Sequence, residues 1–314
     1  MPFNNILSYF PRNIANIIEK YFGTHNMQGF NELEEIRLRA NKPLILKLNK
    51  VEKIFEYTIT SEDLLETLQH ICNNSIYSYQ NQICNGYITV NGGHRVGITG
   101  NVVVENNRVI NINYISSLNF RVSKQIIGCS NKILKYILDI ENNNIFNTLI
   151  VSPPGAGKTT LLRDIIRKIS MGIENANFKG ISVGVVDERA ELAAMSKGLP
   201  ANDLGIRTDI LDNIPKAIGM KMLIRSMAPK VIAADEIGSI EDVEAINYAI
   251  CSGIKGIFTA HGSSLEEILL NPALESIIKL HIFERIIFLS NKGVKGDIEK
   301  IYVLNKINSE YIPM

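Results

Sequence analysis

The most informative segment of the chain is TLIVSPPGAGKTTLL, residues 148–162. An apolar run leads into a loop with Gly155 and Gly157, and a second apolar segment with helical spacing follows. Backbone N–H groups of such a loop must wrap closely around an anion, and side chains at the two glycines would block that approach. The pattern therefore predicts a strand, a phosphate-binding loop, and a helix whose N-terminal dipole faces the phosphates.

Side chains in this loop match those that hold a nucleotide with its magnesium ion. The ammonium of Lys158 is expected on the β- and γ-phosphates, and the hydroxyl of Thr159 on Mg²⁺. The strict pattern G-x-x-x-x-G-K-[ST] has a glycine where this chain has Ser152, but that position only ends the strand. We predict that ATP and Mg²⁺ bind here, and that the contacting residues are Pro154, Gly155, Ala156, Gly157, Lys158, Thr159 and Thr160.

Two carboxylates follow a second apolar run, VIAADE at residues 231–236. The run predicts a buried strand whose carboxyl end carries Asp235 and Glu236, and open α/β sheets bind their ligands at that end. Hydrolysis of a nucleotide requires a held Mg²⁺ and a group that orients the attacking water. We expect Asp235 to hold the ion through water, and Glu236 to polarise the nucleophilic water.

Other polar groups stand at further strand ends. Glu188 ends VVDE (185–188) and is a candidate to support Mg²⁺ or the water, while Thr259 and His261 in GIFTAHG (256–262) are candidates to sense the γ-phosphate. Phosphoryl transfer often uses an arginine to neutralise developing charge. Spacing alone does not choose among four candidate arginines: Arg95, Arg121, Arg207 and Arg225.

The second half of the chain alternates short apolar runs with helical segments. The predicted strands are 148–152, 182–187, 231–235, 256–260, 285–289 and 300–304, and the predicted helices are 159–170, 214–227, 239–251 and 265–270. This alternation predicts an α/β domain over residues 131–314, with a mostly parallel sheet covered by helices on both faces.

The first part of the chain is predicted to be a smaller α+β domain, residues 1–130, including a linker. Helices are expected at 10–21 and at 61–72, the second with a serine cap, and strands at 35–39 and 43–48. Two hairpins are expected, 87–90 with 94–100 about the turn Asn91-Gly92-Gly93, and 101–104 with 109–114. The asparagine-rich stretch 137–147 places the junction near residues 125–145.

Composition excludes some classes of protein. The 314 residues carry 33 basic and 32 acidic side chains, a net charge of +1, so no global basic field favours nucleic acid. The basic segments 163–168 and 292–295 are expected on solvated faces. None of the four cysteines forms a C-x-x-C pair, which predicts reduced, buried thiols in a cytosolic protein. Without a signal peptide or an apolar run of about 18 residues, we expect a soluble cytoplasmic protein.

The motifs resemble, in order, those of the type II/IV secretion ATPase superfamily. The phosphate loop corresponds to residues 152–159, and an acidic "Asp box" to residues 186–191. A Walker B strand corresponds to residues 231–236, and a "His box" to residues 259–262. The likeness is closest to the stage III sporulation AA family of endospore-forming bacteria, and it covers nearly the whole chain. The matching stretches include EEIRLR (34–39), NGGHRVGITG (91–100), LNFRVSKQI (118–126), VGVVDERAELAA (183–194), GIRTDILD (205–212) and PKAIGMKMLIRSMAPKVIAADEIG (215–238).

The resemblance implies a RecA-like ATPase domain, a homo-hexamer with nucleotide between subunits, and a location in the mother-cell cytoplasm. It also implies a role in energising a channel between mother cell and forespore, with membrane-protein partners and no membrane insertion of its own. By the same analogy Arg95 or Arg121 senses the nucleotide, and Arg207 and Arg225 approach phosphates in cis or across an interface. The superfamily usually has Gly-Glu where this chain has Asp235-Glu236, a departure that strengthens the prediction of hydrolysis.

Two alternative functions stay open at this point. A nucleic-acid-dependent ATPase would be expected to carry an aromatic-basic stripe, which the sequence lacks. A nucleotide-switched scaffold without turnover would have little use for the water-orienting carboxylate predicted at Glu236.

Overall fold

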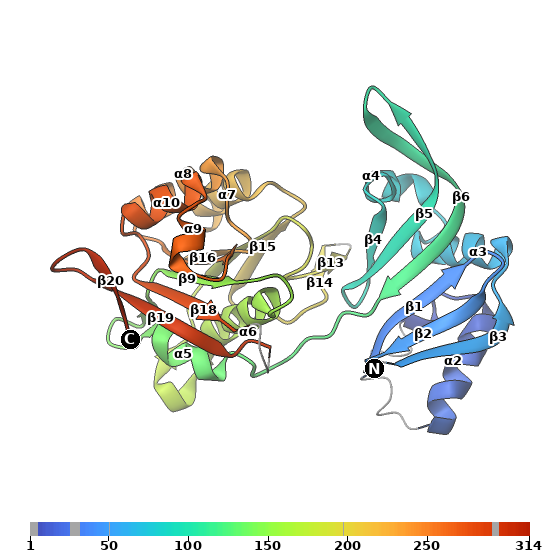
Figure 1. The fold of residues 1–314 in the computed structure, drawn as a ribbon, viewed down its shortest axis with the longest axis horizontal. Coiled ribbons are helices and arrows are strands. Elements are labelled where there is room, and N and C mark those ends of the chain that lie inside the picture. Colours follow the sequence, from blue (N-terminus) through green and yellow to red (C-terminus); the bar gives the residue numbers. More distant parts are fainter. Residues whose placement is uncertain (1–5, 26–31, 50, 197, 291–294) are drawn as a thin grey trace. The chain divides into compact units, whose positions relative to one another are not determined.

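The computed structural model describes residues 6–25, 32–49, 51–196, 198–290 and 295–314 (Figure 1). The chain divides into two compact units, the first made of residues 1–124 and 194–201, and the second of residues 125–193 and 202–314. The sequence predicts domains of 1–130 and 131–314. The segment 194–201 groups with the first unit because its hairpin, β13 (Met195–Ser196) and β14 (Leu199–Pro200), packs there, with Ala194 against Gly93.

The first unit is built on a six-stranded antiparallel sheet. Its strand order is β3-β2-β1-β6-β5-β4, and each neighbouring pair is antiparallel. The strands are β1 (Leu33–Arg39), β2 (Pro43–Leu48), β3 (Val51–Thr58), β4 (Tyr87–Val90), β5 (His94–Glu105) and β6 (Arg108–Arg121). We did not predict β3, an edge strand that is exposed except at Phe55 and Tyr57, which are half-buried against the core.

Two hairpins of this sheet follow the sequence prediction, with longer strands than expected. Gly92 and Gly93 turn the chain between β4 and β5 with φ angles of +90° and +72°, a region that favours glycine. The predicted segments 94–100 and 101–104 form the single strand β5, which pairs along its length with β6. Strand β5 therefore belongs to both hairpins, and with β6 it makes one long ribbon (Figure 1).

Helices bury one face of this sheet. The apolar residues of α2 (Arg12–His25) and α3 (Ser61–Ile71) join the strands in one core cluster. The cap of α3 is Thr60 rather than the predicted Ser61, because the Thr60 side chain accepts from the Asp63 N–H and the Asp63 carboxylate accepts from the Thr60 N–H. Short elements η2 (Ile76–Tyr79) and α4 (Gln80–Cys84) lead into β4.

The second unit is built on an eight-stranded sheet of order β15-β12-β16-β17-β9-β18-β19-β20. The first six strands are parallel neighbours, and the last two pairings are antiparallel, which confirms the predicted α/β class with a mostly parallel sheet. The strands are β9 (Thr148–Ser152), β12 (Val183–Asp187), β15 (Thr208–Asp212), β16 (Val231–Ala234), β17 (Lys255–His261), β18 (Arg285–Leu289), β19 (Ile298–Asn305) and β20 (Glu310–Pro313).

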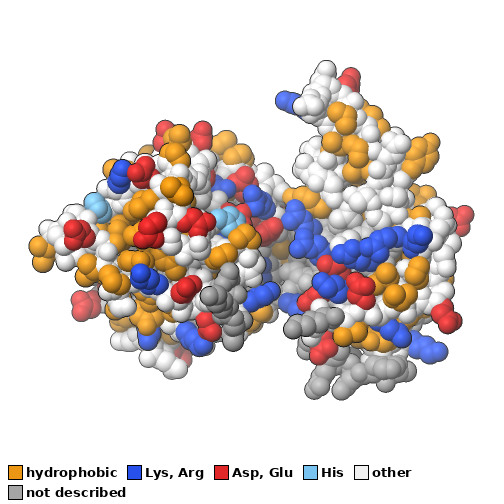
Figure 2. All heavy atoms as spheres, in the orientation of Figure 1, with side chains coloured by type: hydrophobic (Ala, Val, Ile, Leu, Met, Phe, Trp, Pro, Cys, Tyr) orange, Lys and Arg blue, Asp and Glu red, His pale blue; other side chains and the backbone are white. Residues whose placement is uncertain are grey.

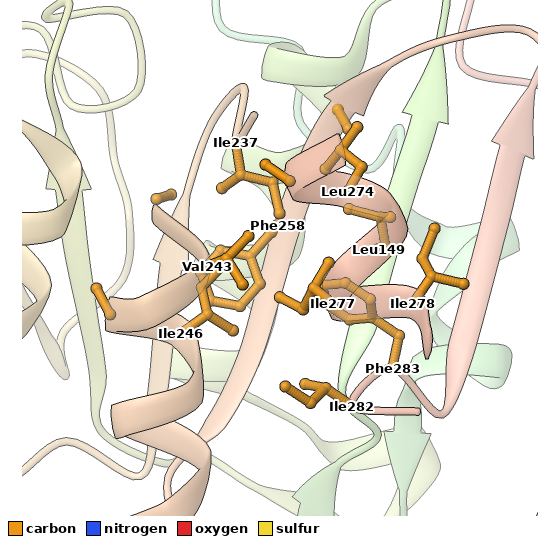
Figure 3. Packing of buried hydrophobic residues seen from close by; sticks show 14 of the residues in the cluster. Leu149, Ile237, Val243, Ile246, Phe258, Leu274, Ile277, Ile278, Ile282 and Phe283 are labelled. Carbon is orange, nitrogen blue, oxygen red and sulfur yellow. The ribbon is translucent and has the colours of Figure 1, made fainter. Parts of the chain in front are cut away.

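Helices cover both faces of this sheet (Figure 1). On one face lie α7 (Lys216–Met227), α8 (Ile240–Cys251), α9 (Leu265–Ile268) and α10 (Pro272–Lys279), and α5 (Asn131–Ile137) and α6 (Lys158–Met171) lie on the other. Figure 3 shows side chains of α8 and α10, among them Ile246 and Ile277, packing onto Leu149 and Phe258 of the sheet. We predicted neither α10, which Asn271 caps just before Pro272, nor the half-buried edge strand β15.

Short additional pairings join the larger elements of the second unit. They are β7 (Leu138–Asp139) with β8 (Asn144–Ile145), and β10 (Gly172–Ile173) with β11 (Phe178–Lys179), with η3 (Glu174–Ala176) between the latter two. The first pairing encloses the turn predicted in the asparagine-rich stretch, since α5 ends at Ile137. No helix among the described residues is long and apolar enough to cross a bilayer.

Two expectations about surface and core were wrong. Arg163 and Arg167, expected on a solvated face, are only 6% and 9% exposed, because α6 packs both against the rest of the second unit. Lys292 lies outside the described residues, and Lys295 is exposed as expected. All four cysteines are free as expected, but only Cys72 is buried, since Cys84 and Cys129 are half-buried and Cys251 is exposed. Figure 2 shows charged side chains of both signs interspersed over the visible face of the second unit.

A candidate nucleotide site at the strand ends

Sheet topology brings the predicted motifs together. Strands β12, β16, β17 and β9 are consecutive parallel neighbours, so their carboxyl ends lie at one edge of the sheet. Strands β9, β12 and β16 are fully buried along their length, and their polar groups begin where they end. This edge therefore receives the phosphate loop after Ser152, Asp187 of β12, Asp235 and Glu236 after β16, and His261 of β17.

The loop from Pro153 to Gly157 has the backbone that its glycines predict. Gly155 and Gly157 have φ angles of +78° and +94°, in the left-handed region that side chains disfavour. A β-carbon on Gly155 would meet nothing within 4 Å, so that side of the loop is open to a ligand. Helix α6 starts directly after Gly157, and the N–H groups of its first turn, at Lys158, Thr159 and Thr160, have no partner within the helix. These donors suit a phosphate group.

Lys158 is buried behind this loop. Its ammonium donates to the carbonyls of Ser152 and Pro153, at 2.8 and 3.3 Å, and lies 3.1 Å from Nδ1 of His261. Burial lowers the pKa of Lys158, while the carboxylates of Asp235 and Glu236 act to raise it. Phosphates placed at the loop would add further negative charge and favour the charged amine.

Oxygen atoms suited to a magnesium ion stand beside the loop. The Thr159 hydroxyl donates to Oδ2 of Asp235 at 2.5 Å, and the Thr259 hydroxyl contacts Oδ1 of the same carboxylate. Mg²⁺ prefers oxygen ligands and is usually held in proteins by one or two side chains together with phosphates and water. A hydroxyl and a carboxylate side by side fit that ion. Among the described residues no group of three or more His, Cys, Asp or Glu side chains forms an alternative cluster.

Glu236 has an unusual backbone and two side-chain partners. Its φ angle is +53°, and its N–H donates to the Thr259 hydroxyl at 2.8 Å. Its Oε1 lies 2.9 Å from Nε2 of His261, and its Oε2 accepts from the Arg189 guanidinium. Residues other than glycine seldom adopt the left-handed backbone region, and those that do are often found at functional sites. The carboxylate is thus held on both oxygens at the sheet edge.

The two nitrogens of His261 have different partners, which fixes the tautomer. The Lys158 ammonium can only donate, so Nδ1 of His261 accepts from it. The proton of the neutral ring is then on Nε2, which donates to the Glu236 carboxylate. His261 therefore links the phosphate-loop lysine to the carboxylate of the Walker B strand.

The acidic loop after β12 is organised by Asp187 rather than by Glu188. The buried carboxylate of Asp187 accepts from the N–H groups of Glu191, Leu192 and Ala193 at 2.8 to 3.1 Å. The Arg163 guanidinium donates to the carbonyls of Glu191 and Leu192 from the other side. We predicted neither role. The position of Asp187 at the end of an apolar run was the one available signal for its role.

Glu188 itself points to the rim of the site. Its Oε2 pairs with the ammonium of Lys216, the first residue of α7, at 2.7 Å. Both residues line a hollow with Arg189, Asp235 and Glu236. Glu188 is therefore near the predicted catalytic carboxylate and already has a cationic partner.

Two predicted arginines of the second unit lie away from the phosphate loop. Arg207 donates to the carbonyl of Ser170 at 2.9 Å, at the C-terminal end of α6, whereas the loop is at the N-terminal end of that helix. Arg225 is exposed in the last turn of α7, over the Tyr248 ring at 6.0 Å. A role in cis is wrong for both, because the lengths of α6 and α7 separate them from the site. A role toward a neighbouring subunit stays a prediction.

The other two predicted arginines belong to the sheet of the first unit. Arg121 in β6 is the register partner of both Glu35 in β1 and Arg95 in β5. The Arg95 guanidinium stacks on the Tyr87 ring at 3.5 Å. Both arginines lie on the face opposite the apolar core, since Phe120 and Val96 beside them are buried. Their role toward a nucleotide stays a prediction.

Known proteins with similar folds include an ATPase and a pilus motor. The ATPase DotB of Legionella pneumophila superposes with a TM-score of 0.55 at 14% identity, over 95% of this chain and 79% of that one. The pilus retraction motor PilT, solved with bound ADP, gives a TM-score of 0.56 at 16% identity, over 91% and 79%. Identities this low establish similarity of fold alone.

Similarity of sequence is more specific. The family described as "Sporulation stage III, protein AA" matches residues 7–308. Stage III sporulation protein AA of Bacillus subtilis is 37% identical over 299 residues, covering 95% of this chain and 94% of that protein. The residues matched by the family span most of both units and the whole of the candidate site. The chain therefore belongs to the stage III sporulation protein AA family.

Proposed function

We propose that the chain is a Mg²⁺-dependent ATPase that drives a sporulation-specific secretion-like assembly. The observation that carries the proposal is the contact of three motifs at one sheet edge: Lys158 of the phosphate loop, Glu236 after the Walker B strand, and His261 between them. Membership of the sporulation family and the fold shared with secretion ATPases support the same conclusion.

Each residue of the site has a separate role in the proposed hydrolysis. The loop N–H groups and Lys158 bind the phosphates, and Thr159 with Asp235 would hold Mg²⁺, which neutralises charge on the phosphates when bound. Glu236 orients the attacking water and accepts its proton, because its carboxylate is at the strand end that faces the loop. His261 keeps that carboxylate in place through its Nε2–H. Glu188 supports the water from the rim.

The proposal also covers the oligomeric state, the partners and the cellular location of the protein. We propose a homo-hexamer with nucleotide between subunits, in which Arg95, Arg121, Arg207 or Arg225 is supplied across the interface. The partners are membrane proteins of a channel between mother cell and forespore, and the protein works in the mother-cell cytoplasm, at the engulfing membrane through a partner. The family match and the secretion-ATPase fold support this role.

The test measures Mg²⁺-dependent phosphate release against protein concentration for wild type, Glu236→Gln and Glu241→Gln. The chain has no Trp, so product release is a better signal than intrinsic fluorescence. We expect turnover per subunit to rise with concentration, to fall about 100-fold or more in Glu236→Gln, and to persist in the control variant in the first turn of α8.

Other outcomes of this experiment point elsewhere. Equal turnover by wild type and Glu236→Gln would favour a nucleotide-switched scaffold or a contaminating enzyme. Strong stimulation by single-stranded DNA would favour a nucleic-acid-dependent ATPase. If turnover does not change with protein concentration but still requires Glu236, the proposed ATPase activity stands and the proposed oligomeric motor is contradicted.

A further inference from the structure

The turn before β19 reaches the phosphate loop from a distant part of the chain. The N–H of Gly296 donates to the carbonyl of Ala156 at 2.9 Å. A β-carbon built on Gly157 would lie 3.5 Å from Cβ of Lys295 and 3.7 Å from the Gly296 nitrogen. The Lys295–Gly296 backbone therefore lies against the glycine that precedes Lys158.

Further contacts fix this turn in place. The Ser290 N–H, after β18, donates to the carbonyl of Asp297 at 2.8 Å. The Asp297 carboxylate accepts from the Lys132 ammonium of α5 at 3.0 Å. Gly296 has a φ angle of +85°, which a side chain would disfavour. Lys295 is thus attached to a backbone that is tied to the sheet, to α5 and to the phosphate loop.

The Lys295 side chain is exposed, and no carboxylate among the described residues pairs with it. Its neighbour Lys132 already neutralises Asp297. A lysine is a compact cation on a flexible four-carbon stem, and it binds phosphate as a point charge. Lys295 therefore adds positive charge beside a loop whose N–H groups already suit an anion.

We infer that Lys295 is a second phosphate-binding lysine of the nucleotide site, acting on the α- or β-phosphate in cis. The inference rests on the proposed ATPase function. Glycine-rich phosphate loops cradle the α- and β-phosphates with their backbone, and Lys295 lies at Gly157 of that backbone. Hydrogen bonds join Lys158 to His261 and His261 to Glu236. In the proposed mechanism the terminal phosphate and the water react beside these three residues. Lys295 thus binds ATP and ADP alike and takes no part in the chemical step.

The test measures dissociation constants of fluorescent mant-ATP and mant-ADP, with KM and kcat, for Lys295→Ala, Lys295→Gln and Lys295→Arg. Losing one charge-assisted contact weakens binding by about tenfold. We expect that loss for both nucleotides and for both neutral variants, with a raised KM, kcat within about twofold of wild type, and recovery in Lys295→Arg. Lys230→Ala is the matched control, an exposed lysine just before β16 at the opposite edge of the sheet.

Each contrary result overturns a definite statement. Wild-type affinity in both neutral variants, with thermal unfolding unchanged, would show that Lys295 does not bind nucleotide. A loss confined to mant-ATP would place the contact on the γ-phosphate and overturn the assignment to the α- or β-phosphate. If wild type and Lys158→Ala both fail to bind nucleotide, the proposed function falls and this inference with it. Wild-type binding that Lys158→Ala abolishes and Lys295→Ala leaves unchanged would remove only the inference.

Discussion

At the scale of single residues, neighbouring carboxylates in the acidic loop have different physical roles. Asp187 is buried and accepts hydrogen bonds from three backbone N–H groups, while Glu188 is at the rim and forms an ion pair with Lys216. Buried hydrogen bonds to a charged group contribute more to stability than exposed ion pairs do. The conformation of the acidic loop therefore depends on Asp187. Arg189 of the same loop forms an ion pair with Glu236.

This difference predicts unequal costs for two similar substitutions. Asp187→Asn replaces one acceptor oxygen with an amide that faces backbone donors, so we expect the free energy of unfolding to fall by about 2 to 3 kcal/mol. Glu188→Gln is the matched control and should cost less than about 1 kcal/mol. Urea denaturation monitored by circular dichroism measures both. Equal losses would show that Asp187 does not hold the loop.

Arg163 shows how a residue can be misjudged from sequence. In a basic segment it resembles a solvated side chain, yet it is buried, and burial lowers its pKa while nearby acids, first Asp187, act to raise it. Its guanidinium binds the carbonyls of Glu191 and Leu192 from across the sheet edge. Only the packing of α6 beside the acidic loop gives it this partner, since the two segments are far apart in sequence.

Among the helices and strands, α8 is held in place shortly after β16. Ser239 caps it, because the Ser239 hydroxyl accepts from the Asp242 N–H at 3.1 Å and the Asp242 carboxylate accepts from the Ser239 N–H at 3.2 Å. Three residues separate Glu236 from the start of the helix. The cap therefore limits fraying close to the predicted catalytic carboxylate.

Removing this cap has an expected cost. Ser239→Ala should lower the free energy of unfolding by about 1 kcal/mol, the usual value for a serine cap. The control Ser226→Ala removes an exposed hydroxyl that donates to the Met222 carbonyl within α7, and it should change stability by less than about 0.5 kcal/mol. Urea denaturation compares the two. A control that costs as much as the cap variant would contradict the role of the capping box.

At the scale of the whole molecule, the stability of the chain should depend on pH through His94 of the first unit. Its imidazole is buried, with Nδ1 accepting from the Ser123 N–H, and burial lowers its pKa from 6.5 to about 4. The unfolded chain takes up a proton below pH 6.5, whereas the folded chain does so only near pH 4. The contribution is therefore full above pH 6.5 and is lost as the pH falls toward 4.

The size of this loss follows from the shift. Between pH 7 and pH 4.5 wild type should lose about 2 to 3 kcal/mol more unfolding free energy than His94→Asn, which cannot take up the proton and can still accept from Ser123. Comparing the two proteins cancels the loss from carboxyls whose pKa is lowered, such as Asp63 and Asp164. His281→Asn is the control and should keep the wild-type pH dependence. Parallel curves for wild type and His94→Asn would exclude His94 as the cause.

The α/β class and the parallel strands of the second unit could be predicted from the sequence, and so could the residues of the phosphate loop. Those features depend on local patterns: glycines that permit a left-handed backbone, apolar runs that must be buried, and polar residues where the runs end. The same patterns predicted Asp235, Glu236 and His261 as site residues, since parallel strands end at one sheet edge.

The folded chain was needed to show which distant residues meet at that edge and which do not. It placed the Lys295 turn on the phosphate loop, Arg189 on Glu236, and the segment 194–201 with the first unit, and it left Arg207 at the far end of α6. Strand order and helix packing determine such contacts. Neither has a local signature, because both depend on burying apolar faces from many segments at once.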